Sequence, residues 1–213
     1  MLSAGAKKEI APYRGRVPVC TLVILAGGIL TYVLPGLPNA LVYDRSEILA
    51  GGIWRLFTGH WVHFSASHLF FNLLAIGVAG CVIEVRRYPH FPVLCVLSGL
   101  AIGTGLLVLE PGMHNYGGLS GLATSAFYFL ALHGMKERGP LRWLCVSAFL
   151  IMTCKIFYEL WTGQAVFVES SAVPFVPAVQ SHVMGALMAL MVFGWSTGPS
   201  LLQKLKKIFC VRD

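Results

Sequence analysis

The stretch HWVHFSASHLFFNLLAIGVAGCVI, residues 60–83, combines a long apolar run with polar side chains near its start. As a helix it is long enough to cross the ~30 Å hydrocarbon core of a membrane. Polar groups in such a helix are costly and usually face the interior of a helix bundle. His68 and Asn72 are four residues apart, so they share one face. His63 precedes His68 by five residues, about 140° around an ideal helix, and we expect it at the mouth of the helix, apart from that pair.

The composition of the whole chain agrees with a membrane protein. Of its 213 residues, 56% are apolar and 12% are charged, and the mean hydropathy is +0.73. A soluble domain usually carries roughly twice that share of charge. We therefore predict an all-α, polytopic membrane protein with a bundle of six transmembrane helices. The expected spans are 17–34, 61–83, 91–109, 117–133, 141–161 and 178–195.

The net charge of +7 does not indicate nucleic-acid binding, because no basic run is interleaved with aromatic residues. In a membrane protein the basic residues instead determine how the chain is oriented across the bilayer. Of the 16 Lys and Arg residues, thirteen fall at the chain ends and the inner links, and only Arg45 and Arg55 fall on the opposite side. The positive-inside rule then places both termini in the cytoplasm. We divide the chain into a cytoplasmic segment 1–16, a membrane domain 17–196 and a basic tail 197–213. A cleaved signal peptide is the alternative for the first span, but such peptides have a shorter apolar run of ~7–15 residues.

A second notable stretch is NYGGLSGLATS, residues 115–125, in which Ser120 lies between small residues. It permits two interpretations, a packing contact between helices or a hydroxyl placed for chemistry. Small residues recur every four positions in two spans, which predicts close packing of spans four and six. These residues are Gly117 and Gly121 in span four, and Ser181, Gly185 and Ala189 in span six.

Three polar side chains are expected at a similar depth in the membrane. At 1.5 Å per residue, Ser120 lies ~24 Å before Lys136, and His68 lies ~27 Å before Arg86. His182 lies ~20–24 Å before the end of the sixth span. A hydroxyl and two imidazoles at one level are what a nucleophile, a base and an anion-stabilising group require. Transporters also gather polar groups at one depth, so depth alone leaves both readings open.

Taken together, these motifs resemble the rhomboid family of intramembrane serine proteases. The resemblance covers roughly residues 17–196. It rests on WRLFTGHWVHFSASHLFFNLLA (54–75), GLSG (118–121) and HVMGALMA (182–189), and Glu84 also falls where rhomboids often carry Glu.

The resemblance implies that Ser120 is the nucleophile and His182 its general base, in a dyad without a carboxylate. It implies that His68, Asn72 and the Ser120 backbone N–H stabilise the oxyanion. Two positions differ from the family pattern. Rhomboids often have a Tyr four residues after the nucleophile, against which the base stacks, and here that residue is Thr124; Ala189 stands where Gly is common. The supporting residues implied are Trp54, Arg55, His63, Gly118, Gly121 and Gly185.

The expected function is cleavage of transmembrane or membrane-proximal segments of membrane-anchored proteins near the outer face of a bacterial inner membrane, with no metal or cofactor. The short chain and its YGGLSGL motif also resemble the rhombosortase subgroup, which is thought to process proteins with a C-terminal Gly-Gly-type sorting segment. A non-catalytic scaffold or small-solute transporter of this fold, and a transferase that uses an amine in place of water, are the alternatives. The outer segment 162–177 is either a gate for substrate or a plain linker. Lys155 and Glu159 are four residues apart and are expected to pair.

Overall fold

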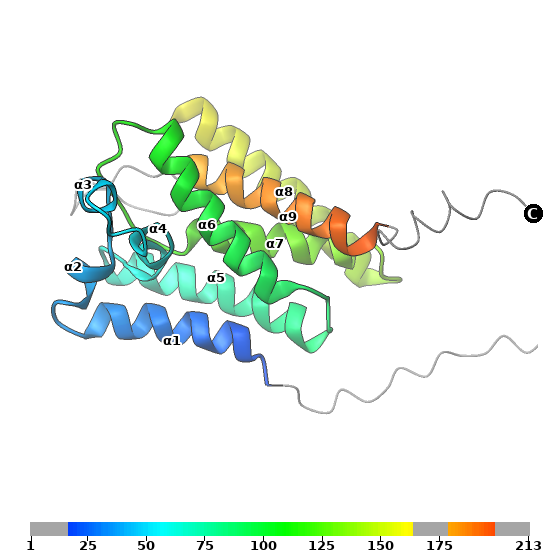
Figure 1. Ribbon diagram of the computed structural model, residues 1–213. Coiled ribbons are helices and arrows are strands. Elements are labelled where there is room, and N and C mark those ends of the chain that lie inside the picture. The colour runs from blue at the N-terminus through cyan, green and yellow to red at the C-terminus, as the bar shows by residue number, and fades with distance from the viewer. Residues whose placement is uncertain (1–16, 164–178, 199–213) are drawn as a thin grey trace, which may run out of the picture.

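The chain folds into a bundle of long helices with a group of short elements at one end (Figure 1). The computed structural model describes residues 17–163 and 179–198. The expected segment 1–16, residues 164–177 of the expected outer segment 162–177, and most of the tail lie outside the described residues. Each of the six expected spans contains one long helix: α1 (Val19–Val33), α5 (Ala66–Val85), α6 (Phe91–Leu109), α7 (Ser120–Gly134), α8 (Pro140–Thr162) and α9 (Val179–Thr197).

Four of the described helices, α5, α6, α8 and α9, are long and apolar enough to cross a membrane. The expectation of six full spans is therefore not confirmed. Helix α1 is apolar but has 15 residues. Helix α7 also has 15 residues, or about 22 Å of helix, and most of its residues are buried. It needs neither the length nor the outward apolar surface of a lipid-facing span, because other helices surround it.

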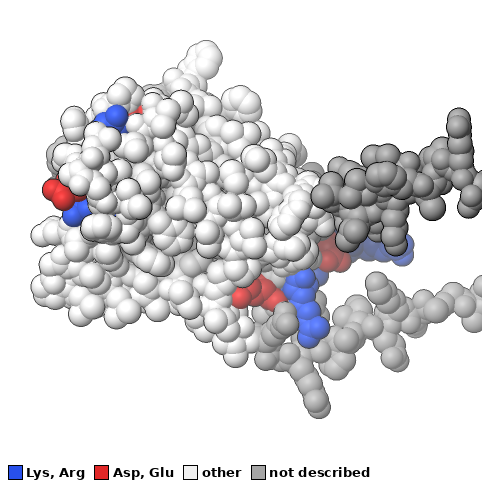
Figure 2. All heavy atoms as spheres, in the orientation of Figure 1, with Lys and Arg blue, Asp and Glu red and all other residues white. Residues whose placement is uncertain are grey.

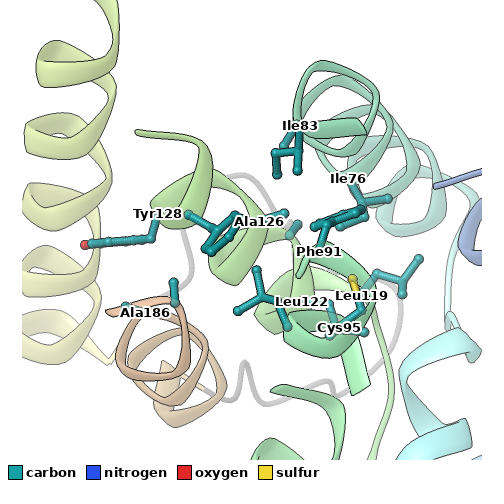
Figure 3. Close-up of a cluster of buried hydrophobic side chains, with 14 of the residues drawn as sticks. Ile76, Ile83, Phe91, Cys95, Leu119, Leu122, Ala126, Tyr128 and Ala186 are labelled. Carbon is teal, nitrogen blue, oxygen red and sulfur yellow. The ribbon is translucent and has the colours of Figure 1, made fainter. Parts of the chain in front are cut away.

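Helix α7 occupies the middle of the bundle and packs against α5, α6, α8 and α9. Figure 3 shows the apolar side chains around it, with Ile76 and Ile83 from α5, Phe91 from α6 and Ala186 from α9. Helices α5, α7 and α9 run in the same direction, so their first residues lie at the same end of the bundle as the short elements (Figure 1). This parallel arrangement follows from the alternation of the expected spans, of which these are the second, fourth and sixth, and it places the polar residues of the three helices at one end.

The short elements at that end form a cap over the start of α7. They are α2 (Leu37–Leu41), β1 (Tyr43–Asp44), α3 (Arg45–Leu49), α4 (Arg55–Thr58) and the 3-10 helix η1 (Gly59–Trp61). Strand β1 pairs antiparallel with β2 (Asn115–Tyr116), with Tyr43 opposite Tyr116. The pairing ties the cap to the chain just before α7.

Helix α5 begins later than the apolar pattern predicted. We expected the span from residue 61, but Ser65 is extended and its hydroxyl accepts a hydrogen bond from the His68 backbone N–H at 3.2 Å. Such a cap satisfies one of the free donors at a helix start. Residues 62–65 therefore form a connection between η1 and α5, and His63 lies in that connection.

Glu84 joins α1 to the far end of α5. One carboxylate oxygen accepts from the Cys20 N–H at 3.0 Å, and the other accepts from the Thr21 N–H at 2.8 Å and the Thr21 hydroxyl at 2.6 Å. A carboxylate at a helix N-terminus satisfies free donors and complements the helix dipole. Glu84 thus acts as the cap that α1 lacks in its own sequence, since no side chain of its own N-cap residue does so.

Charged side chains on the visible face gather at its two ends, with an uncharged belt between them (Figure 2). Large apolar side chains such as Phe70, Leu74, Ile151 and Trp161 are exposed along the helices. A soluble protein would bury such a surface, whereas a bilayer covers it.

Candidate active site

Ser120 is the first residue of α7, and the backbone before it has a conformation that favours glycine. Gly118 has φ +124°, a value that side chains rarely adopt. Its N–H donates to Gly59 O at 3.4 Å, and its carbonyl oxygen accepts from the Tyr116 hydroxyl at 3.2 Å. These contacts fix the turn that delivers Ser120 to the helix start, where the side chain is half-buried.

His68 and Asn72 lie against this turn, on the shared face of α5 that their spacing predicts. A Cβ placed on Gly118 would come within 2.7 Å of His68 Nε2 and 3.4 Å of Asn72 Nδ2. Both side chains are buried. Asn72 Nδ2 has no hydrogen-bond partner among the described residues. Buried polar groups are normally paired. The amide of Asn72 is therefore a donor, next to the Gly118 turn, that is available to an acceptor from outside the described residues.

The prediction that His63 stays apart from His68 is wrong. The two rings pack edge to face with centroids 5.1 Å apart. The helical-wheel argument assumed a helix through residue 63, and none exists there. His63 Nδ1 is 3.0 Å from Trp61 O, and it must carry the proton because a carbonyl only accepts. Burial, reinforced by the proximity of His68, lowers the pKa of His63 to about 3, so this ring is neutral at neutral pH.

Helix α9 approaches the start of α7 through small residues. A Cβ on Gly121 would lie 3.0 Å from Ser181 O, and a Cβ on Gly185 would meet the Gly121 carbonyl oxygen. The predicted close contact between spans four and six is thus confirmed. It brings His182, the residue after Ser181, to the level of Ser120.

Ser120 and His182 share no hydrogen bond in the described structure, and His182 bonds through its other nitrogen. In structures without substrate, catalytic hydrogen bonds are often long and tighten only in the complex. Thr124 does not take the place of the aromatic residue that rhomboids often carry, because its hydroxyl donates to Ser120 O within the same helix at 2.9 Å.

The second nitrogen of His182 contacts a carboxylate, which we did not foresee. Nδ1 lies 2.8 Å from Glu159 Oε2, and Glu159 Oε1 lies 2.6 Å from Lys155 Nζ. The predicted pairing of Lys155 with Glu159 is confirmed, but the expected dyad without a carboxylate does not describe this geometry. The depth argument applied to Ser120 gives Glu159 a similar depth, because Glu159 lies 17 residues after Arg142, about 26 Å along α8, but it does not give the direction of the side chain.

Trp54 and Arg55 support the cap rather than the site. Arg55 Nη1 donates to Asn39 O and Val42 O, both at 2.9 Å, and Trp54 Nε1 donates to Ala40 O at 3.2 Å. These bonds satisfy carbonyl groups around α2 and hold the segment that precedes β1. Their effect on Ser120 is therefore indirect, through the pairing of β1 with β2.

One family of known proteins matches most of the chain. The family model described as Rhomboid domain matches residues 50–200. The chain belongs to the rhomboid family. The match spans most of the chain and includes every site residue named above. A search of curated proteins found no match.

Membership of the rhomboid family makes this chain a multi-pass membrane protein of a family of intramembrane proteases. Rhomboid proteases act on membrane proteins within the bilayer. The outward apolar belt and the buried polar cluster of this rhomboid agree with that setting.

Proposed function

We propose that this rhomboid is an intramembrane serine endopeptidase with Ser120 as nucleophile and His182 as general base. The observation that carries the proposal is the convergence on the Gly118 turn, where Ser120, His68 and Asn72 meet beside the close contact of α7 with α9. A hydroxyl, an imidazole and hydrogen-bond donors at one buried level are the components of acyl transfer.

In the proposed reaction Ser120 Oγ attacks the scissile carbonyl carbon, and His182 Nε2 takes the hydroxyl proton. The developing oxyanion is stabilised by Asn72 Nδ2, His68 and the Ser120 backbone N–H. Donors preorganised in a dry site are worth more than donors in water. His182 then gives the proton to the leaving amine, and a water molecule hydrolyses the acyl-enzyme.

The substrates we propose are transmembrane or membrane-proximal segments of membrane-anchored proteins, cut near the outer face of a bacterial inner membrane. The resemblance to rhombosortases extends this to C-terminal sorting segments of the Gly-Gly type. In support, the site lies near one end of the bundle, under the cap, and not at its middle (Figure 1).

The test uses a fluorophosphonate probe on the purified protein in detergent. We expect labelling at Ser120, and we expect Ser120→Ala and His182→Ala to lose both labelling and cleavage of a fluorescent transmembrane peptide. Turnover by folded Ser120→Ala protein would contradict the proposal. A failure of the wild type to label or cleave would instead favour a scaffold or transporter.

Substrate class and acceptor are tested separately. Cleavage of a protein with a C-terminal Gly-Gly sorting segment is compared with cleavage of one in which that segment is scrambled. We expect a preference for the intact segment. Mass spectrometry of the product with and without added amine distinguishes hydrolysis, which we expect, from transfer.

A further inference from the structure

We propose that Glu159 is a positioning residue for His182, so that the site is a Ser-His-Glu triad and not a dyad. The inference rests on the proposed function, since it assigns a partner to the proposed base. Glu159 comes from α8 and His182 from α9, and the Glu159 side chain is fully buried while His182 is 9% exposed. The carboxylate thus reaches the imidazole from a different helix, inside the bundle.

The contact determines which nitrogen of His182 carries the proton. An ionised carboxylate only accepts hydrogen bonds, so Nδ1, at 2.8 Å from Oε2, must be the donor. In the neutral ring Nε2 then bears the lone pair. Nε2 makes no hydrogen bond to any residue the structure describes and is free to accept the Ser120 proton. This is the tautomer that a general base needs.

Lys155 keeps the carboxylate in the form that this role requires. Its ammonium group lies 2.6 Å from Glu159 Oε1, one helical turn away on α8. A buried carboxylate without a cation would tend to take up a proton, and a protonated Glu could donate to Nδ1 and impose the other tautomer. The two oxygens are therefore divided, with Oε1 bonded to the fixed cation and Oε2 bonded to the base.

The same contact offsets charge during the reaction. When Ser120 attacks, its proton moves to Nε2 and His182 becomes an imidazolium. Glu159 stays ionised and compensates that new positive charge without taking the proton. Thr124 bonds within its own helix, whereas Glu159 contacts the His182 ring directly at Nδ1.

The first test compares variants at residue 159 by steady-state cleavage of the fluorescent transmembrane peptide. Glu159→Gln keeps the shape but loses the obligate acceptor, and we expect kcat to fall by up to about 10⁴-fold with KM nearly unchanged, as when the carboxylate of a Ser-His-Asp triad is replaced by an amide. Glu159→Asp should recover at least ten-fold of that loss. The matched control is Thr153→Val, which removes another interhelical hydrogen bond of α8, the one from Tyr128 at 2.9 Å, and should leave kcat unchanged.

The second test does not depend on the Glu159 variants. Wild-type protein labelled with ¹⁵N-histidine is studied by NMR in detergent, and the His182 signals are identified by their loss in His182→Ala. We expect the neutral tautomer with the proton on Nδ1. A proton on Nε2 would overturn the proposal whether or not the Glu159 variants fold.

The outcomes separate this inference from the proposed function. If Glu159→Gln cleaves like the wild type while Ser120→Ala is inactive, the protease stands and Glu159 is only a tether between α8 and α9. If Glu159→Gln and Thr153→Val lose kcat equally, the loss is structural and the positioning role fails. If Ser120→Ala cleaves like the wild type, the proposed function fails. The NMR measurement of the His182 tautomer then still shows whether Glu159 accepts a hydrogen bond from Nδ1.

Discussion

Gly185 on α9 lies against the backbone carbonyl of Gly121 on α7, leaving no room for a side chain. Backbone cannot move aside as a flexible side chain can, so a methyl group there must push the helices apart. His182 lies one turn before Gly185 and moves with it. The separation of His182 from Ser120 is therefore set by two residues without side chains.

We expect Gly185→Ala to lower the free energy of unfolding by about 1–3 kcal/mol and cleavage by at least about 10²-fold, since small misplacements of catalytic groups have that cost. The matched control is Gly194→Ala on the same helix, where a Cβ would meet nothing within 4 Å. That variant should cleave normally. Thermal unfolding and peptide cleavage measure the two effects, and equal behaviour of the two variants would contradict the packing argument.

Gly118→Ala should be inactive for a different reason. The added methyl group would lie 2.7 Å from the His68 ring, on a residue whose φ of +124° disfavours any side chain. Both the turn before Ser120 and the oxyanion donors would be displaced. Gly112→Ala, in the loop before β2 with open space around it, is the control. Fluorophosphonate labelling of Ser120 should be lost in the first variant and kept in the second.

The sequence predicted the features that depend on local pattern and direction. The six long helices, the common direction of α5, α7 and α9, and the shared face of His68 and Asn72 follow from apolar runs and from spacing. The starts of α5 and α7 were predicted several residues too early, because aromatic and glycine residues extend the apolar run. Ser65 caps α5, and the positive φ of Gly118 excludes helix before Ser120.

The contact between Glu159 and His182 could not be read from spacing, because it joins residues 23 apart on two helices. The i,i+4 pattern identified Lys155 as a partner of Glu159, and that pair is present. Which side of α8 faces α9 depends on packing around α7. The depth of Glu159 was available from the sequence, whereas its direction was not.

The lowered pKa of His63 predicts that the folded protein loses stability in mild acid. Burial lowers the pKa of His63 to about 3 in the folded protein, whereas an exposed histidine has a pKa of about 6.5. As the pH falls below about 6.5 the unfolded chain binds a proton that the folded protein refuses, so stability falls with pH. Between pH 7 and pH 5 the free energy of unfolding falls by about 2 kcal/mol, at 1.36 kcal/mol for each pH unit below the pKa of histidine in the unfolded chain.

The melting temperatures of the wild type and His63→Gln at pH 7 and pH 5 measure this effect. We expect a smaller drop in the variant, because it lacks the titrating ring at this position. The same drop in both proteins would show that other groups cause the acid sensitivity.

The orientation of the chain is tested by fusions. We expect both termini in the cytoplasm, since thirteen of the 16 Lys and Arg residues fall on that side. A fluorescent protein that matures only in the cytoplasm should be bright when fused after Asp213. Alkaline phosphatase, active only outside, should be active when fused to a chain truncated after Gly112. The reverse pattern would place the active-site end of the bundle in the cytoplasm.

Asn72→Ala and His68→Ala should slow the reaction without abolishing it. Loss of one oxyanion donor typically costs about 10²–10³ in kcat, and the Ser120 N–H remains in either variant. For Asn72 the structure adds a prediction about stability. Its Nδ2 is buried without a partner among the described residues, and an unsatisfied buried group costs about 1–3 kcal/mol.

Removing the amide removes the energetic cost of an unsatisfied buried donor but adds the cost of a cavity. We expect these two energies to be similar, so the free energy of unfolding of Asn72→Ala should stay within about 1 kcal/mol of the wild type. Single-turnover cleavage and thermal unfolding are measured on the same samples. A large loss of stability would show that the amide is paired in the folded protein. Wild-type turnover would show that it serves packing and not the oxyanion. Slow turnover at unchanged stability is the result that assigns Asn72 to the transition state.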